Sequence, residues 1–168
     1  MAERDETRWL AIDEQRAWRA YVLGTELLNH QLDHELREEH DLSFSEYEIL
    51  VRLSEAEGNR MRMATLADSM CHSRSRVTHT VARMEKAKLV RREASHTDGR
   101  GVEAVMTPAG QQRLDEAAPT HVRGVRAHLV DLATEEEFKV IGRLFNEVSD
   151  RLLTDRPGNA DIRDAIGI

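Results

Sequence analysis

The stretch "CHSRSRVTHTVARMEKAKLVRRE" (residues 71–93) gathers Arg, Lys and His in a chain whose formal net charge is −7. Residues 60–100 hold ten Lys and Arg against four Asp and Glu, a net charge of +6, so the rest of the chain carries −13. A basic block inside an acidic chain indicates a local site for a polyanion. The alternative is the solvated face of a charged helix, and the pattern within the block decides between the two.

The order of elements within the block indicates how it folds. Ser73 is a good N-cap, and Val77, Val81 and Met84 follow at i, i+4 and i+7 as one narrow apolar stripe. A short helical run, "ATLADSM" (64–70), precedes it, and two strand-like runs, "LVRREA" (89–94) and "VEAVMT" (102–107), flank a turn-rich "SHTDGRG" (95–101). Two short helices with a tight join and then a hairpin predict a winged helix-turn-helix, whose second helix enters the DNA major groove.

Side chains outside the apolar stripe are the candidates for DNA contact. Arg74 and Arg76 stand near the start of the predicted recognition helix, and the forked Arg side chain matches two acceptors of guanine. Arg83, two turns further on, is expected at a phosphate, and Arg100 at the hairpin tip is expected in the minor groove. Together with the neighbouring hydrogen-bonding and cationic groups, the candidates are Ser73, Arg74, Ser75, Arg76, Thr78, His79, Thr80, Arg83, Arg91 and Arg100.

Helical patterns extend on both sides of the block. One runs from about Thr7 to Arg37, and a capping box of Ser43 and Glu46 opens another. Residues 107–110, "TPAG", restart a helix; its apolar face is expected to consist of Leu114, Ala118, Val122, Val125, Leu129 and Leu132. Pro119 is expected to kink this helix or to end its first half. A second capping box, Thr134 with Glu137, opens the last helix.

These patterns predict a mainly α fold, a winged helix-turn-helix with a small β-hairpin wing and long N- and C-terminal dimerisation helices. We expect one domain over residues 1–168, with a DNA-binding lobe at 43–107, dimerisation helices at 7–38 and 108–154, and a C-terminal tail at 155–168. A monomeric winged helix needs only about 70–100 residues. Because the long terminal helices carry apolar stripes that neither the small basic lobe nor each other can fully cover, we expect a homodimer with a two-fold axis. The alternative is that these helices pack against each other within one chain.

The chain resembles the MarR family of bacterial transcription regulators. The resemblance rests on "LADSMCHSRSRVTHTVARMEKAKLVRR" (66–92), then "TDGRG" (97–101) and "VMTPAG" (105–110), with "LSFSEYEIL" (42–50) as the preceding helix. It extends over roughly residues 10–154, and its strongest part is the D-x-R wing tip followed by T-P-x-G. It implies a homodimer that binds a palindromic operator in double-stranded DNA and is often released by a small molecule. It also implies that Asp98 braces the wing, which adds Asp98 to the DNA-binding candidates.

This sequence departs from the family pattern at several positions. Lys88 stands where the family usually has the Gly that closes the recognition helix, and Cys71 and His72 replace a common Gly and aliphatic residue. In the wing, Thr97 and the run 99–101, Gly-Arg-Gly, replace a usual Pro and paired arginines.

Other residues favour competing interpretations. Cys71, just before a helix start, is a candidate redox sensor, against the commoner role of a small buried hydrophobe. His30, His34 and His40 are a candidate metal-sensing group, against the commoner case of histidines on solvated faces. A small aromatic or acidic ligand is a candidate partner, and its candidate site consists of Trp18, Tyr21, His34, Tyr47 and Glu48, against a role of the rings as plain core.

The sequence also argues against several classes. It contains no P-loop, GxSxG or GxGxxG motif, so we expect no enzyme, no cofactor and no bound metal. No apolar run approaches the roughly 18–20 residues of a membrane span, and "MAERDETRW" has no signal-peptide core, so we expect a cytoplasmic protein. The main expectation is a sequence-specific repressor. The alternatives are a redox- or metal-sensing regulator of the same fold and a non-specific architectural DNA-binding protein.

Overall fold

The computed structural model describes residues 7–95 and 101–153. Its helices and strands are α1 (Ile12–His40), α2 (Phe44–Glu55), β1 (Arg60–Arg62), α3 (Met63–Ser69), α4 (Arg74–Lys86), β2 (Val90–Ala94), β3 (Val102–Met106), α5 (Pro108–His128) and α6 (Glu135–Leu153), with 3-10 turns at Glu57–Asn59 and Val130–Leu132. The expected order of helix, tight join, helix and hairpin is confirmed.

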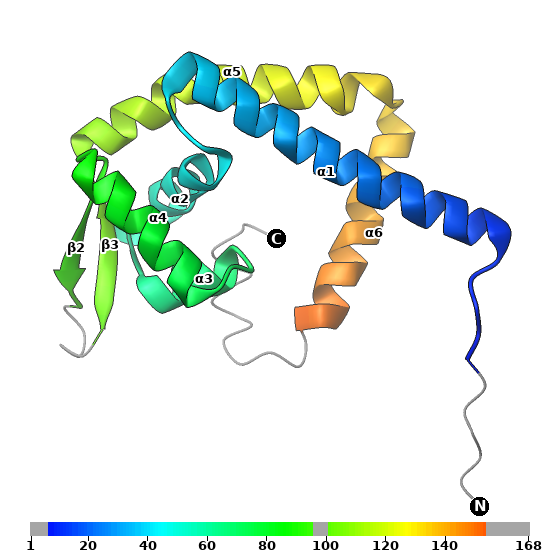
Figure 1. Ribbon diagram of the computed structural model, residues 1–168, viewed down its shortest axis with the longest axis horizontal. Helices are drawn as coiled ribbons and strands as arrows, with labels where there is room; N and C mark the ends of the chain where they lie inside the picture. Colours follow the sequence, from blue (N-terminus) through cyan, green and yellow to red (C-terminus); the bar gives the residue numbers. More distant parts are fainter. Residues whose placement is uncertain (1–6, 96–100, 154–168) are drawn as a thin grey trace, which may run out of the picture.

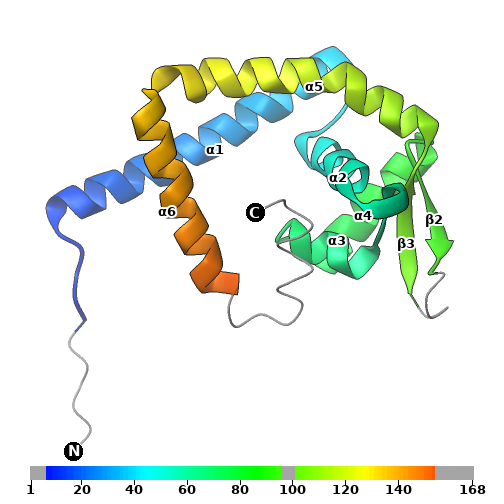
Figure 2. The ribbon, with the colours of Figure 1, turned by 180° about the vertical axis from the view of Figure 1, so that it is seen from behind.

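The elements separate into a compact lobe and a frame of long helices. α2, α3, α4 and the sheet lie together, while α1 and α5 run side by side above them and α6 leaves the far end of α5 (Figures 1 and 2). Periodicity predicted a helix from about Thr7 to Arg37. α1 instead begins at Ile12 and ends at His40, so both of its ends lie further along the chain.

Side-chain caps set the starts of several helices as expected. Ser43 Oγ accepts a hydrogen bond from Glu46 N at 3.3 Å, and Ser43 N donates to Glu46 Oε2 at 2.9 Å, which completes the predicted capping box of α2. Thr134 and Glu137 form the same reciprocal pair before α6. Thr107 Oγ1 accepts from Gly110 N at 3.0 Å at the start of α5.

The core of the lobe forms where the apolar stripe of α4 meets α2 and the sheet. Val77, Val81 and Met84 are at most 1% exposed, as the spacing predicted. They belong to one buried cluster with Leu50 and Leu53 of α2 and with residues of α3 and the sheet. Burial of this stripe fixes which face of α4 points outward.

The wing is a three-stranded antiparallel sheet with the strand order β1-β3-β2. In the register of the central strand, Ala104 pairs with both Met61 of β1 and Arg92 of β2. The sequence predicted only the two hairpin strands. β1 was missed because its three residues, Arg-Met-Arg, are too few to show the alternation by which strands are recognised.

The predicted apolar face of α5 was right at Leu114, which is buried, and wrong at Val122 and Leu132. The buried residues are Gly110, Leu114, Ala117, Thr120 and Gly124, while Val122 is 54% exposed and Leu132 is 77% exposed. The helix continues through Pro119 instead of ending there. Small residues face inward because α1 approaches closely: a Cβ on Gly124 would lie 2.8 Å from Leu32 Cδ2.

The end of α4 explains how Lys88 replaces the usual Gly. Lys88 has φ +62°, Lys88 N donates to Glu85 O at 3.0 Å, and Leu89 N donates to Met84 O at 2.9 Å. This is a Schellman ending with a lysine in the left-handed position. α5 then packs directly on the ending, because a Cβ on Gly110 would lie 2.1 Å from Leu89 O. The close backbone approach is the physical reason for the glycine in T-P-x-G.

Candidate DNA-binding interface

The outward face of α4 is polar and cationic. Ser73 caps the helix by accepting from Arg76 N at 3.2 Å, so the helix starts where the sequence predicted. Opposite the buried stripe, the exposed side chains near this start are those of Arg74, Ser75, Arg76, Thr78 and His79. These five candidates are therefore accessible at the start of α4.

Many arginines of the basic block are neutralised within the protein. Arg83 pairs with Glu46 at 3.1 Å, Arg92 with Glu85 at 2.6 Å, Arg60 with Glu93 at 3.5 Å, and Arg91 with Glu93. Within residues 7–95 and 101–153, neither Arg74 nor Arg76 forms an ion pair with a carboxylate. Arg74 and Arg76 therefore place uncompensated positive charge at the start of α4, where a recognition helix meets base edges.

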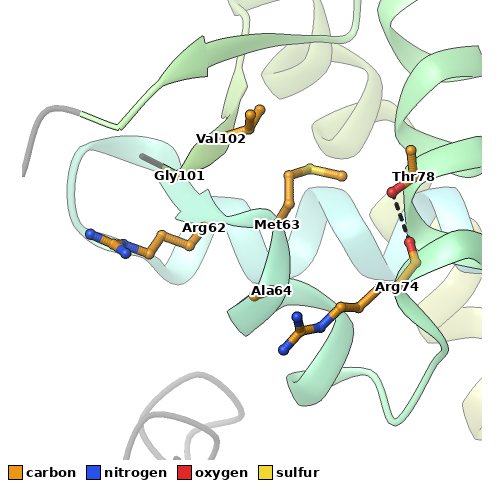
Figure 3. Close-up of a pocket in the computed structure, with 7 residues that line it drawn as sticks. All are labelled: Arg62, Met63, Ala64, Arg74, Thr78, Gly101 and Val102. Atoms are coloured by element: carbon orange, nitrogen blue, oxygen red, sulfur yellow. Dashed lines mark hydrogen bonds between the residues drawn. The ribbon is translucent and has the colours of Figure 1, made fainter. Parts of the chain in front are cut away.

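Arg74 borders a pocket between α4, the start of α3 and the start of β3. The pocket has a volume of about 270 Å³ and is lined by Arg62, Met63, Ala64, Arg74, Thr78, Gly101 and Val102. Figure 3 shows Met63 between Arg62 and Arg74 in the lining of the pocket. Arg74 places a positive charge at the edge of this pocket, so an anionic group such as a phosphate would be attracted there.

Arg76 points towards α2 instead. Its Nη2 donates to Ser45 Oγ at 3.4 Å, and it lies close enough to Glu48 to influence that carboxyl. Burial raises the pKa of Glu48, and the charges of Arg52 and Arg76 oppose the rise. Burial lowers the pKa of His72, and the positive charge of Arg76 adds to the effect. Burial and the charge of Arg76 thus favour the neutral form of His72, while no described carboxylate pairs with the guanidinium of Arg76.

Among the candidates in the described residues, Thr80 differs from expectation. Thr80 is 6% exposed and its hydroxyl donates to Arg76 O, so it faces the lobe and not the outer surface, which corrects its assignment as a DNA contact. Arg83 and Arg91 remain 61% and 50% exposed but are held by glutamates. Asp98 and Arg100 lie outside the described residues.

A polar cluster near the end of β2 and the start of β3 was missed by the sequence analysis. Glu103 is only 7% exposed, and its carboxylate accepts from Ser95 Oγ at 2.7 Å and from Arg60 Nη1 at 3.4 Å. These bonds connect β1, β3 and Ser95, the residue that follows β2. The available signal was a glutamate inside the apolar run "VEAVM", which is unusual unless the carboxylate has buried partners.

The candidate ligand residues are not gathered into one site. Trp18 and Tyr21 are neighbours on α1, and Tyr21 contacts Phe145 of α6, with ring centroids 5.3 Å apart. Tyr47 of α2 is buried and contacts His121 of α5 at 4.6 Å. Within the described ranges no ring contact joins the two groups. His34 pairs with Glu38, and Glu48 lies near Arg76.

The other sensor candidates have simple surroundings. Cys71 is exposed in the join between α3 and α4, with φ +51°. In the part of the chain that the structure describes, no group of three or more His, Cys, Asp or Glu residues could hold a metal ion. His40 is hydrogen-bonded to Thr120 Oγ1 at 2.8 Å. Among the described helices, none is long and apolar enough to cross a membrane.

A capped helix with exposed, unpaired arginines at its start, held beside a three-stranded wing, defines a winged helix-turn-helix DNA-binding protein. A model of the MarR family matches residues 42–102. AbsC, a MarR family transcriptional regulator from Streptomyces coelicolor, is 43% identical over 87% of this chain and 98% of its own, with a TM-score of 0.81. The chain therefore belongs to the MarR family, whose members are transcription regulators and not enzymes.

Two further solved structures are similar. Sco3205, a MarR family transcriptional regulator from Streptomyces coelicolor whose structure is a complex with DNA, is 38% identical over 90% of this chain and 95% of its own, with a TM-score of 0.85. The transcriptional regulator BldR from Sulfolobus solfataricus is 26% identical over 83% of this chain and 99% of its own, with a TM-score of 0.70. A comparison with curated proteins found no match.

Proposed function

We propose that this regulator is a homodimer that binds a palindromic operator through α4 and the wing, and that it acts as a repressor. The observation that carries the proposal is the pair of exposed arginines, Arg74 and Arg76, unpaired by any described carboxylate at the start of α4. The structure of the 38% identical relative Sco3205 in complex with DNA supports the same role for this lobe.

The candidate residues divide by the part of DNA that each can reach. Arg74 and Arg76 are proposed to contact base edges, while Ser73, Ser75, Thr78 and His79 hold phosphates or add hydrogen bonds to bases. Arg83 and Arg91 are proposed at phosphates. By the family resemblance, Asp98 braces the wing and Arg100 enters the minor groove.

Exposed apolar side chains on α1 and α6 support dimerisation. Trp18 and Tyr21 of α1 are 57% and 42% exposed. Along α6 the exposed apolar residues are Val140, Ile141, Leu144, Phe145, Val148 and Leu152. Large contiguous apolar surfaces are uncommon on monomers, and a second copy of the chain supplies a matching surface through a two-fold axis. Two recognition helices about 34 Å apart would then meet successive major grooves on one face of DNA.

Selection of bound duplexes from a random pool tests this function. We expect a palindromic consensus, and we expect its affinity to fall by about 10³–10⁵ between about 50 and about 200 mM salt if the dimer makes roughly 6–10 phosphate contacts. A pool that returns no preferred sequence would favour the non-specific architectural alternative. A flat response to salt would contradict the phosphate-dominated mechanism.

Release by a small aromatic or acidic ligand stays a prediction, as does a cytoplasmic location. Trp18 fluorescence titrated with phenolic acids, alongside operator binding, tests the release. We also propose that residues 43–107 form the DNA-binding lobe and that residues 7–38 and 108–154 form the dimerisation helices.

A further inference from the structure

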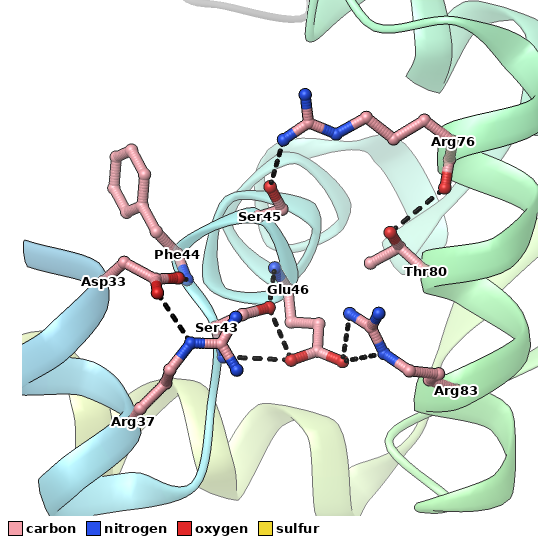
Figure 4. Close-up of polar contacts among 9 residues, drawn as sticks. All are labelled: Asp33, Arg37, Ser43, Phe44, Ser45, Glu46, Arg76, Thr80 and Arg83. Carbon is pink, nitrogen blue, oxygen red and sulfur yellow. Dashed lines mark hydrogen bonds and ion pairs between the residues drawn. The ribbon is translucent and has the colours of Figure 1, made fainter. Parts of the chain in front are cut away.

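The first turn of α2 holds the recognition helix through a single carboxylate. Arg83 Nε and Nη2 both donate to Glu46 Oε1, at 3.2 and 3.1 Å. The other oxygen, Oε2, accepts from Ser43 N at 2.9 Å and from Ser43 Oγ at 2.6 Å. Glu46 therefore closes the α2 capping box with one oxygen and binds α4 with the other (Figure 4).

A second contact joins the same two helices on the same face. Arg76 Nη2 donates to Ser45 Oγ at 3.4 Å, and Arg76 and Arg83 are seven residues apart, two helical turns along α4. Figure 4 shows both guanidinium groups directed at the first turn of α2. Two contacts separated along the helix axis restrict both the rotation of α4 and its sliding along α2.

The same turn is tied to α1. Asp33 Oδ1 accepts from Phe44 N at 2.8 Å, and Asp33 Oδ2 accepts from Arg37 Nε at 2.6 Å. A continuous polar path thus runs from the long helix α1, through the N-terminal turn of α2, to the recognition helix. Because α1 belongs to the frame of long helices, this path relates the direction of α4 to that frame.

The Glu46 carboxylate is well suited to hold the Arg83 side chain in place. The Glu46 side chain is 14% exposed, whereas that of Arg83 is 61% exposed, so the anchor is fixed and the arginine retains an open side. Charge-assisted hydrogen bonds are stronger than neutral ones and more directional when a guanidinium is involved. The pair leaves the exposed part of Arg83 available to a phosphate while fixing where that part points.

We propose that Glu46 is a positioning residue for operator recognition, which sets the direction of α4 by holding Arg83 against the capped start of α2. The proposal rests on the proposed function, in which α4 reads DNA. Glu46 does not contact DNA; it acts through Arg83. The competing role for the same ion pair is a counter-charge that merely withholds Arg83 from phosphates, and the two roles predict opposite effects.

Glu46→Gln in the full-length protein is the informative variant. Gln replaces one of the two accepting oxygens with an NH2 donor, so it cannot accept from Ser43 at one position and from Arg83 at the other, although it keeps the size of the side chain and is compatible with a capping box. Glu85→Gln is the matched control, because Glu85 also pairs with an arginine, Arg92, and its removal deletes the same charge from the lobe. Charge deletion alone should strengthen DNA binding slightly for both variants.

Binding is measured to the selected operator and to a random duplex of equal length. For Glu46→Gln we expect operator binding about three- to tenfold weaker, as for one partly solvated charge-assisted contact, with random-duplex binding slightly stronger, as for Glu85→Gln. Partial unfolding would weaken binding to both duplexes alike. The ratio of operator affinity to random-duplex affinity therefore separates an effect on positioning from an effect on stability. In an Arg83→Gln background, Glu46→Gln should have no further effect on the ratio.

Three results separate the outcomes. If Glu46→Gln behaves like Glu85→Gln, or binds the operator more tightly, Glu46 does not position α4 and the inference is overturned. If its effect persists unchanged in the Arg83→Gln background, it does not act through Arg83 and the inference is also overturned. If the unaltered protein prefers no duplex at all, the proposed function itself fails.

Discussion

At the scale of single residues, the internal ion pairs change how the basic block must be interpreted. The count of ten Lys and Arg in residues 60–100 suggested a broadly cationic surface, but Arg60, Arg83, Arg91 and Arg92 are matched by glutamates. A paired arginine attracts phosphate less strongly, because its partner carboxylate repels the same anion. The arginines at the start of α4 therefore carry most of the proposed discrimination.

Replacement of those arginines should alter sequence preference. Arg74→Ala or Arg76→Ala should cost about 1–3 kcal/mol on the operator and relax the preference at the contacted base pair, as for a base-reading side chain. Arg91→Ala, the control, should weaken all duplexes alike. Competition titrations with operators altered at one base pair measure the effect. If both α4 variants keep the full preference, the recognition helix is misassigned.

The Glu46 carboxyl predicts a pH dependence of stability. Burial favours a higher pKa for Glu46, but the hydrogen bonds from Ser43 and Arg83 outweigh burial and lower its pKa below the ordinary value of 4.5. A lowered pKa in the folded state adds stability above the unfolded pKa, and that stability is lost as pH falls through the folded value. The difference in the free energy of unfolding between the unaltered protein and Glu46→Gln should therefore shrink from about pH 6 to about pH 3. Urea titrations check this, and a pH-independent difference would contradict it.

At the scale of elements, the end of α4 determines how the wing and α5 are joined to the recognition helix. Thr107 Oγ1 donates to Lys88 O at 2.7 Å, and Gly110 packs against Leu89 O. Three elements thus meet at the residues that follow α4. A lysine occupies the left-handed position there, although a side chain with a Cβ is strained at φ +62°.

Lys88→Gly should stabilise the protein. Removing the Cβ relieves the strain at positive φ, and part of that gain is offset by the greater entropy of glycine in the unfolded chain. We expect the free energy of unfolding to rise by about 0.5–1 kcal/mol. Ala87→Gly is the control: Ala87 has φ −77°, so glycine brings no relief and should lower stability. Urea unfolding of both variants measures the effect. A Lys88→Gly protein less stable than the unaltered protein would contradict the strain assigned to Lys88.

At the scale of the whole molecule, the long helices present more apolar surface than one chain covers. Leu153 is the buried residue of α6, whereas the apolar row along its length is exposed. Tyr21 of α1 contacts Phe145 of α6, so apolar residues from the two ends of the chain are continuous on one surface. A dimer that uses this surface would set the distance between two recognition helices, and with it the spacing of the half-sites.

Phe145→Glu should separate the proposed dimer. A carboxylate in the centre of an apolar interface would lose its hydration without gaining a partner. We expect the molecular mass in light scattering to fall towards that of one chain, together with loss of operator affinity, because one lobe holds only one half-site. Asn146→Glu adds the same charge to the neighbouring exposed position and should leave the dimer intact. Equal masses for both variants would place the interface elsewhere.

The sequence by itself determined the elements that depend on local chemistry. Caps at Ser43, Ser73, Thr107 and Thr134 and the stripe of Val77, Val81 and Met84 are specified by neighbours within one or two turns. They placed the winged helix-turn-helix correctly, and family-specific spacing identified the transcription regulator. The local pattern also placed Arg74 and Arg76 on the outward face of α4.

Only the tertiary structure decided what depends on partners distant in sequence. The inward face of α5 follows from the close approach of α1 at Gly124, which no periodicity within α5 encodes. β1 exists because β3 provides its hydrogen bonds, and Thr80 turns inward because of the lobe around it. The pairing of Glu46 with Arg83 joins residues 37 positions apart. Side-chain charge can be counted in a sequence, but its neutralisation depends on which carboxylates the fold brings within reach.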